Sequence, residues 1–107
     1  MKIGFIITKT PQEEGFNNFI KLLKLYMDHD SIYVYLIGNG VYGATSGHVH
    51  SDLIHQIGEK YEINVSKNDL KARGIKKNVL IRGIQIFDDY GNVVGDLMEK
   101  MDHVISF

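Results

Sequence analysis

The residues of this chain whose types and spacing could do chemistry lie in two stretches, residues 38–50 and 66–73. The first stretch contains G-x-G-x-x-G from Gly38 to Gly43. In a dinucleotide-binding domain, the last glycine of this motif opens a helix whose N–H groups bind pyrophosphate. Here Gly47 opposes immediate helix growth, and the chain is too short for two mononucleotide-binding halves. We therefore interpret these glycines as a turn after a strand, where they supply positive φ.

The same stretch ends with His48 and His50, and Asp52 and His55 follow closely. On a strand, His48 and His50 would share one face and could bind a divalent metal together with a third ligand. The surrounding pattern instead predicts a loop that turns into a helix, where a spacing of two residues places side chains on different sides. We expect exposed loop histidines and no cofactor, with His48 and His50 as the alternative metal ligands.

Ser66 opens the second stretch. It could act as a nucleophile only with a base holding its proton, and no Ser/His/acid spacing supplies one. Asp69 follows three residues later, which predicts that Ser66 caps a short helix, and Gly74 suits the position just after its end. A capped helix start at a strand end can also bind an anion, and Asn68 and Arg73 lie nearby in sequence.

Composition narrows the class of protein. The chain has 107 residues, 44% of them hydrophobic and 23% charged, which suits one soluble globular domain over residues 1–107. Twelve basic and thirteen acidic residues leave a net charge of −1, so we expect no general electrostatic binding to nucleic acid or membranes. The chain has no long apolar run and no signal-peptide pattern, so we expect a cytoplasmic protein.

Two further residue types restrict the chemistry. Cysteine is absent, which excludes disulfides, thiolate metal sites and thiol nucleophiles. The tyrosines at positions 33, 35, 42 and 90 have no basic residues interleaved with them, so we interpret them as packing residues and not as a base-stacking platform.

The hydrophobic periodicity predicts the elements that position these residues. Apolar and β-branched runs predict strands at 2–8, 31–37, 62–65, 78–87 (all of it or only its first half) and 103–107. Helical spacing predicts helices at 16–27, 51–61, 66–74 and 88–101. This alternation indicates a three-layer α/β/α fold with a five-stranded, mostly parallel sheet and helices on both faces. The loops after the first three strands, at 9–15, 38–50 and 66–69, are then the expected ligand-binding edge.

Three segments give the chain a family resemblance: YLIGNGV (35–41), INVSKNDLKARGI (63–75) and LMEKMDHVISF (97–107). Together they resemble the DsrE/TusD/DsrH superfamily of small three-layer α/β/α proteins, and LKARGI (70–75) is the most specific piece. The resemblance implies a homo-oligomer, or an oligomer with related chains of the same superfamily. It also implies a link to persulfide sulfur relay, either toward tRNA thiolation or within sulfur oxidation.

One departure from the family pattern bears on activity. Sulfur-carrying members have a cysteine at the start of the short third helix, where this chain has Ser66. A serine hydroxyl cannot form a persulfide, so this chain cannot carry sulfur by that chemistry. Its KNDLKARG segment resembles the cysteine-less DsrH/TusB type, which is thought to be a structural partner in a relay complex.

Three functional hypotheses follow. The first is a non-catalytic structural or regulatory subunit of a sulfur-relay-type oligomer. The second is a small-ligand or anion-binding module, and the third is an enzyme that uses Ser66, a loop histidine or a metal. For the first two, the candidate binding or interface residues are Gly38, Asn39, Gly40, Ser66, Asn68 and Arg73. The first hypothesis has the most support from the sequence.

Overall fold

Five strands form one all-parallel sheet in the order β4-β3-β2-β1-β5. The computed structural model describes residues 1–28, 30–88, 95 and 99–107. The strands are β1 (Lys2–Ile7), β2 (Ser31–Leu36), β3 (Glu62–Ser66), β4 (Gln85–Phe87) and β5 (His103–Ser106). The predicted α/β fold with a five-stranded parallel sheet is therefore confirmed.

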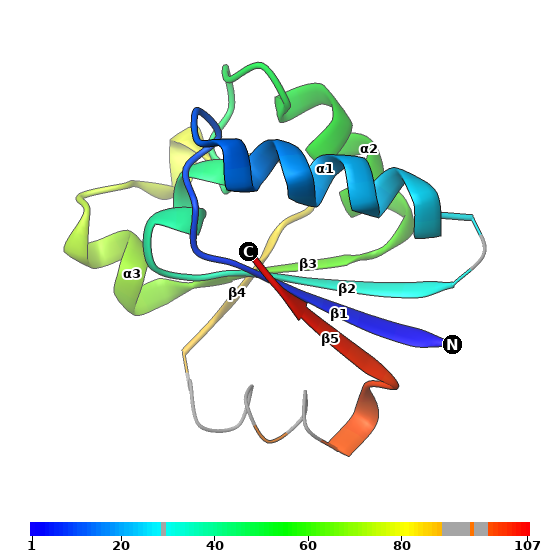
Figure 1. Cartoon of the computed structure of the whole chain (residues 1–107). Coiled ribbons are helices and arrows are strands. Elements are labelled where there is room, and N and C mark those ends of the chain that lie inside the picture. The colour runs from blue at the N-terminus through cyan, green and yellow to red at the C-terminus, as the bar shows by residue number, and fades with distance from the viewer. Residues whose placement is uncertain (29, 89–94, 96–98) are drawn as a thin grey trace.

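Helices α1 (Glu14–Tyr26) and α2 (Ser51–Lys60) lie across one face of the sheet (Figure 1). Helix α3 (Lys67–Ala72) and two 3-10 helices, η1 (Gly38–Ala44) and η2 (Lys77–Val79), lie in the connections beyond the strand ends. On the other side of the sheet, Glu99 and Lys100 are helical (Figure 1). Most of the helix predicted over 88–101 lies outside the described residues, including Tyr90, Val93, Val94, Leu97 and Met98. No helix in the described part of the chain is long and apolar enough to cross a membrane.

The core lies between the sheet and helices α1 and α2. Alternate residues of β1 point toward α1, and Phe5 is fully buried there. Its ring packs edge-on against Phe19, with 5.6 Å between centroids, and Phe19 in turn packs against Phe16 at 5.5 Å. Phe107 joins this cluster at 5.8 Å from Phe19, which ties the end of β5 to the same core.

Strand β4 differs from the prediction in position. The strand occupies Gln85–Phe87, the second half of the expected 78–87 range, and not its first half. The apolar residues ahead of it pack against the loop after β2 instead. Ile81 is buried and donates its N–H to the Ala44 carbonyl, while Leu80 forms a β-bridge with Thr45. Gly83, at a φ of 93°, then turns the chain toward the sheet edge.

The glycine-rich segment also differs from the expected turn and loop. Residues Gly38–Ala44 form the 3-10 helix η1, and its Val41, Gly43 and Ala44 are buried. Gly38 has a positive φ of 53°, as the turn interpretation required. Gly40 serves another purpose, because a Cβ placed there would lie 2.0 Å from the Ile7 carbonyl oxygen. Its lack of a side chain lets η1 sit directly on the end of β1.

Candidate functional site

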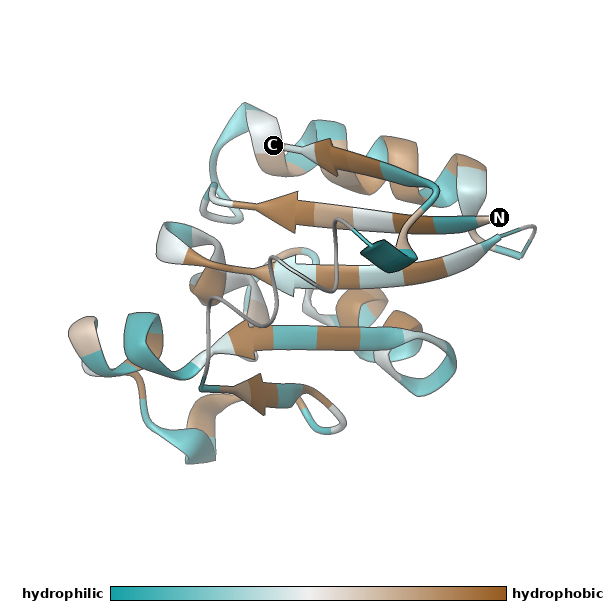
Figure 2. Cartoon of the chain, turned by 90° about the horizontal axis from the view of Figure 1, so that it is seen from below, coloured by the Kyte–Doolittle hydropathy of each residue, from teal (hydrophilic) through white to brown (hydrophobic). Residues whose placement is uncertain are grey.

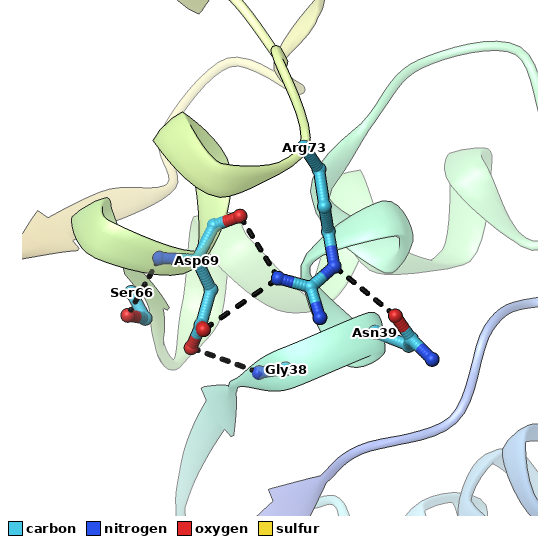
Figure 3. Close-up of polar contacts among 5 residues, drawn as sticks. All are labelled: Gly38, Asn39, Ser66, Asp69 and Arg73. Atoms are coloured by element: carbon cyan, nitrogen blue, oxygen red, sulfur yellow. Dashed lines mark hydrogen bonds and ion pairs between the residues drawn. The ribbon is translucent and has the colours of Figure 1, made fainter.

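Residues from the ends of β2 and β3 meet at one edge of the sheet, as expected for parallel strands. We call Gly38, Asn39, Ser66, Asp69 and Arg73 the strand-end cluster (Figure 3). Gly38 and Asn39 begin η1 after β2, while Ser66 ends β3 and the other two residues belong to α3 and its C-terminal end. The structure thus brings together four of the six candidate residues and adds Asp69.

Ser66 is the helix cap that the sequence predicts. Its Oγ accepts the backbone N–H of Asp69 at 3.3 Å, and Gly74 follows the helix with a φ of 66°. The residue is only 1% exposed. Within the described residues, no histidine is hydrogen-bonded to the Ser66 hydroxyl. The serine is therefore placed to stabilise the start of α3, and no histidine of the described residues is placed to act as its base.

Asp69 connects the two loops. Its Oδ2 accepts the backbone N–H of Gly38 at 2.9 Å, and its Oδ1 lies 3.6 Å from Nη1 of Arg73 (Figure 3). Both side chains are about one-quarter exposed, at 24% for Asp69 and 23% for Arg73. A carboxylate in this position takes up a loop N–H that could otherwise bind an external anion. The chain therefore supplies its own anion at this edge.

Arg73 completes the connection. Its Nε donates to Oδ1 of Asn39 at 3.1 Å, and its Nη1 donates to the backbone oxygen of Asp69 at 3.1 Å. The guanidinium therefore holds η1 against α3 through both of its edges. These bonds position the loop after β2. The negative charge of Asp69 also partly neutralises the positive charge of Arg73.

Two candidate residues lie outside the strand-end cluster. Gly40 is buried in η1, where it contacts the backbone at the end of β1 and supports the cluster from below. Asn68 is exposed on α3 and makes no side-chain hydrogen bond to the described residues of the cluster.

The sequence analysis treated Asp69 only as part of the helix cap and did not predict its contacts with Gly38 and Arg73. Its spacing of four residues from Arg73 is the signal that could have revealed the ion pair.

The loop histidines are half-buried and not exposed as expected. His50 donates its backbone N–H to Nδ1 of His48 at 3.1 Å, so that nitrogen carries no proton. Nε2 of His48 therefore carries the proton and donates it to the Gly43 carbonyl at 3.0 Å. Both ring nitrogens are used, so His48 could bind a metal only by giving up a hydrogen bond. Within the described residues, no three His, Asp or Glu side chains gather in a way that could hold a metal ion.

His50 fixes the loop to α1. Its ring stacks on Phe16 with 5.5 Å between centroids, and its Nε2 lies 2.9 Å from Oδ1 of Asn17. Burial lowers the pKa of His50, and electrostatic interactions with His48 and Lys24 lower it further. The neutral ring is thus the form that fits this site. His55 is separate, since its Nε2 lies 3.4 Å from the Glu59 carboxylate on α2.

Comparisons with known proteins place the fold and the family. A sequence profile described as DsrH like protein matches residues 12–104. This chain is similar to the solved structure of MTH1491, a protein of unknown function from Methanobacterium thermoautotrophicum, with a TM-score of 0.81 and 20% sequence identity. The superposition covers 99% of this chain and 98% of MTH1491. The ychN protein from E. coli gives a TM-score of 0.81 at 17% identity and covers 100% of this chain and 99% of that chain. At these identities the two structures show a common fold alone. A search of curated protein sequences gives no match.

Proposed function

The chain belongs to the DsrH-like protein family, and we propose that it acts there as a cysteine-less, non-catalytic subunit of a sulfur-relay-type oligomer. The observation that carries this proposal is the state of Ser66, the residue at the position where sulfur-carrying members have cysteine. Its hydroxyl is buried and caps α3. The chain has no cysteine elsewhere, so the persulfide must be carried by another chain of the oligomer.

The geometry of the strand-end cluster favours a positioning role over ligand capture. Asp69 already accepts the Gly38 N–H and pairs with Arg73, so an external anion would have to displace a carboxylate. The alternative hypothesis, a small-ligand or anion-binding module at this edge, therefore has less support. A rigid loop held by its own ion pair is instead suited to present a fixed surface to another subunit.

Exposed apolar side chains in the connections after β2 and α3 support assembly through these loops. Val49 is 84% exposed in the loop before α2, and Tyr42 and Val79 are also exposed on η1 and η2. The loop and η2 are joined, because Ser46 donates its N–H to the Val79 carbonyl at 2.8 Å. Exposed aromatic and aliphatic side chains of this kind form the centre of many protein interfaces. We call these three side chains the loop patch.

Native mass measurement of the protein purified from its source tests the assembly. We expect a stable oligomer that contains this chain, either alone or with a cysteine-bearing chain of the same superfamily. Val49→Asp should lower the native mass without unfolding the chain, because it places a charge in the loop patch. Leu25→Asp is the matched control, since Leu25 is 71% exposed on α1, away from this edge. A monomer at high concentration with no cysteine-bearing relative bound would contradict the proposal.

A sulfur-transfer assay with labelled persulfide tests the non-catalytic role. The label should appear on the cysteine-bearing partner and never on this chain, yet transfer should slow when this chain is omitted. Omission without any effect on the rate would show that the chain is not a working subunit of the relay. That result would leave the family membership intact and would refute the role.

A further inference from the structure

Positive charge is concentrated in the connection between β3 and β4, although the chain as a whole is almost neutral. Residues 67–82 contain six of the twelve basic residues but only one of the thirteen acidic residues, Asp69. This segment therefore has a net charge of +5, and the rest of the chain has a net charge of −6. We call residues 67–82 the basic connection. Because salt screens exposed charges beyond about 8 Å at physiological ionic strength, a partner responds to this local charge more than to the total.

Most cations of the basic connection have no acidic partner in the described part of the chain. Lys67 lies 3.5 Å from the Asp88 carboxylate, and Arg73 lies 3.6 Å from that of Asp69. The other four are exposed and form no ion pair with a described residue: Lys71, Lys76, Lys77 and Arg82. Repulsion among clustered like charges raises the free energy of the folded chain. An external anionic group would offset this repulsion.

The backbone of the basic connection is held by its own hydrogen bonds. Figures 1 and 2 place α3 and η2 at the end of the molecule toward which the strands point, and Figure 2 shows that both are largely hydrophilic. The turn after α3 folds back on the helix, because Ile75 donates its N–H to the Leu70 carbonyl at 3.0 Å. Val79 donates to the Lys76 carbonyl at 3.2 Å, which closes η2. The lysines are therefore presented from defined turns, beside the strand-end cluster.

The composition of this surface favours a protein partner over a nucleic acid. A single strand is held by aromatic rings on which its bases stack, and residues 67–82 contain no Phe, Tyr, Trp or His. A long duplex would also extend over the rest of the chain, whose net charge of −6 repels phosphate. A short run of carboxylates on a partner protein meets only the local positive charge.

We propose that the basic connection binds an acidic segment of a partner protein. The exposed ammonium groups pair with its carboxylates, and such pairs act mainly on the rate of association and on the choice of partner. Binding should therefore depend strongly on salt. The basic connection borders the loop patch at η2, so the experiment has to separate the two surfaces. The proposal does not depend on the sulfur-relay role, and each can fail alone.

Fluorescence anisotropy on the full chain tests the proposal, with a short labelled peptide of alternating glutamate and serine as the probe. The comparison probes are the corresponding lysine–serine peptide and single-stranded and double-stranded DNA of the same total charge as the acidic peptide. We expect the acidic peptide to bind with a dissociation constant below about 100 μM at low salt, and several-fold more weakly at physiological salt. No binding of the acidic peptide, or tighter binding of either DNA, would overturn the proposal.

Paired variants locate the surface. Lys76→Gln combined with Lys77→Gln should weaken peptide binding at least about threefold, since it removes two exposed cations from the basic connection. Lys21→Gln combined with Lys24→Gln is the matched control, because it removes the same total charge from exposed positions on α1 and should leave binding unchanged. Both double variants should keep the native mass and the urea unfolding midpoint of the parent chain. Equal weakening by the two would overturn the proposal, because binding would then depend on total charge alone. A lower native mass for the first would also overturn it, because the oligomer would then cover this surface.

Discussion

Replacing Gly40 with alanine would test how tightly η1 is packed on the central strand. The new Cβ would lie 2.0 Å from the oxygen and 2.7 Å from the carbon of the Ile7 carbonyl. Both atoms belong to the backbone, and the same oxygen accepts the N–H of Ile37 at 3.1 Å. No side-chain rotation can relieve this contact, so β1 or η1 must move.

The structure also indicates the size of the effect. Overpacking that neighbouring side chains can partly relieve costs about 1–3 kcal/mol, and here the obstacle is backbone. We therefore expect Gly40→Ala to lower the free energy of unfolding by about 3 kcal/mol or more. Because domains of this size are typically stable by about 5–15 kcal/mol, the loss would be a large part of the total.

Urea and thermal unfolding followed by circular dichroism measure this loss. We expect a melting temperature lower by at least about 12 °C, given about 4–8 °C for each kcal/mol. Gly58→Ala is the matched control, because its Cβ would lie 3.7 Å from Cδ1 of Ile63, an ordinary contact. In α2 this change should stabilise the protein by up to about 1 kcal/mol. Equal unfolding midpoints for the two variants would refute the close-packing argument.

Three further predictions concern the cap, the ion pair and the loop histidine. Ser66→Ala should lower the free energy of unfolding in urea by about 1 kcal/mol, since the Asp69 N–H loses its acceptor; no loss would mean that Ser66 is not a working cap. Asp69→Asn should cost about 1–2 kcal/mol through weaker bonds to Gly38 and Arg73, and high salt should reduce the difference from the parent chain. The lowered pKa of His50 means that the unfolded chain binds the proton more strongly. The stabilisation that neutral His50 provides should be complete above the pKa of about 6.5 that histidine has in the unfolded chain. It should be lost as the pH falls through the pKa of His50 in the folded chain. His50→Gln should flatten this part of the stability profile in urea titrations, and an unchanged profile would contradict the assignment.

Much of the fold could be predicted because local pattern and tertiary structure agree in most elements. β-branched and aromatic residues mark β2, and helical spacing from Phe16 marks α1. The fourth strand was misplaced because Leu80 and Ile81 are as apolar as strand residues. Their partners, Thr45 and Ala44, lie far away in sequence. Periodicity identifies a buried segment but not the surface that buries it.

The candidate site could be predicted only where a local rule applies. Ser66 and Asp69 follow a capping pattern that spans three residues, so the cap was recognised. The bond from Gly38 to Asp69 joins residues 31 positions apart and depends on the pairing of β2 with β3.

The order of the strands restricts how copies of this protein can associate. The two edges of the sheet are β4 and β5, which have only three and four residues. Short edge strands offer few unpaired N–H and C=O groups, so another chain gains little by adding a strand there. Association through side chains on loops or on a sheet face is therefore favoured over backbone pairing, and unwanted fibre-like growth along the sheet is disfavoured.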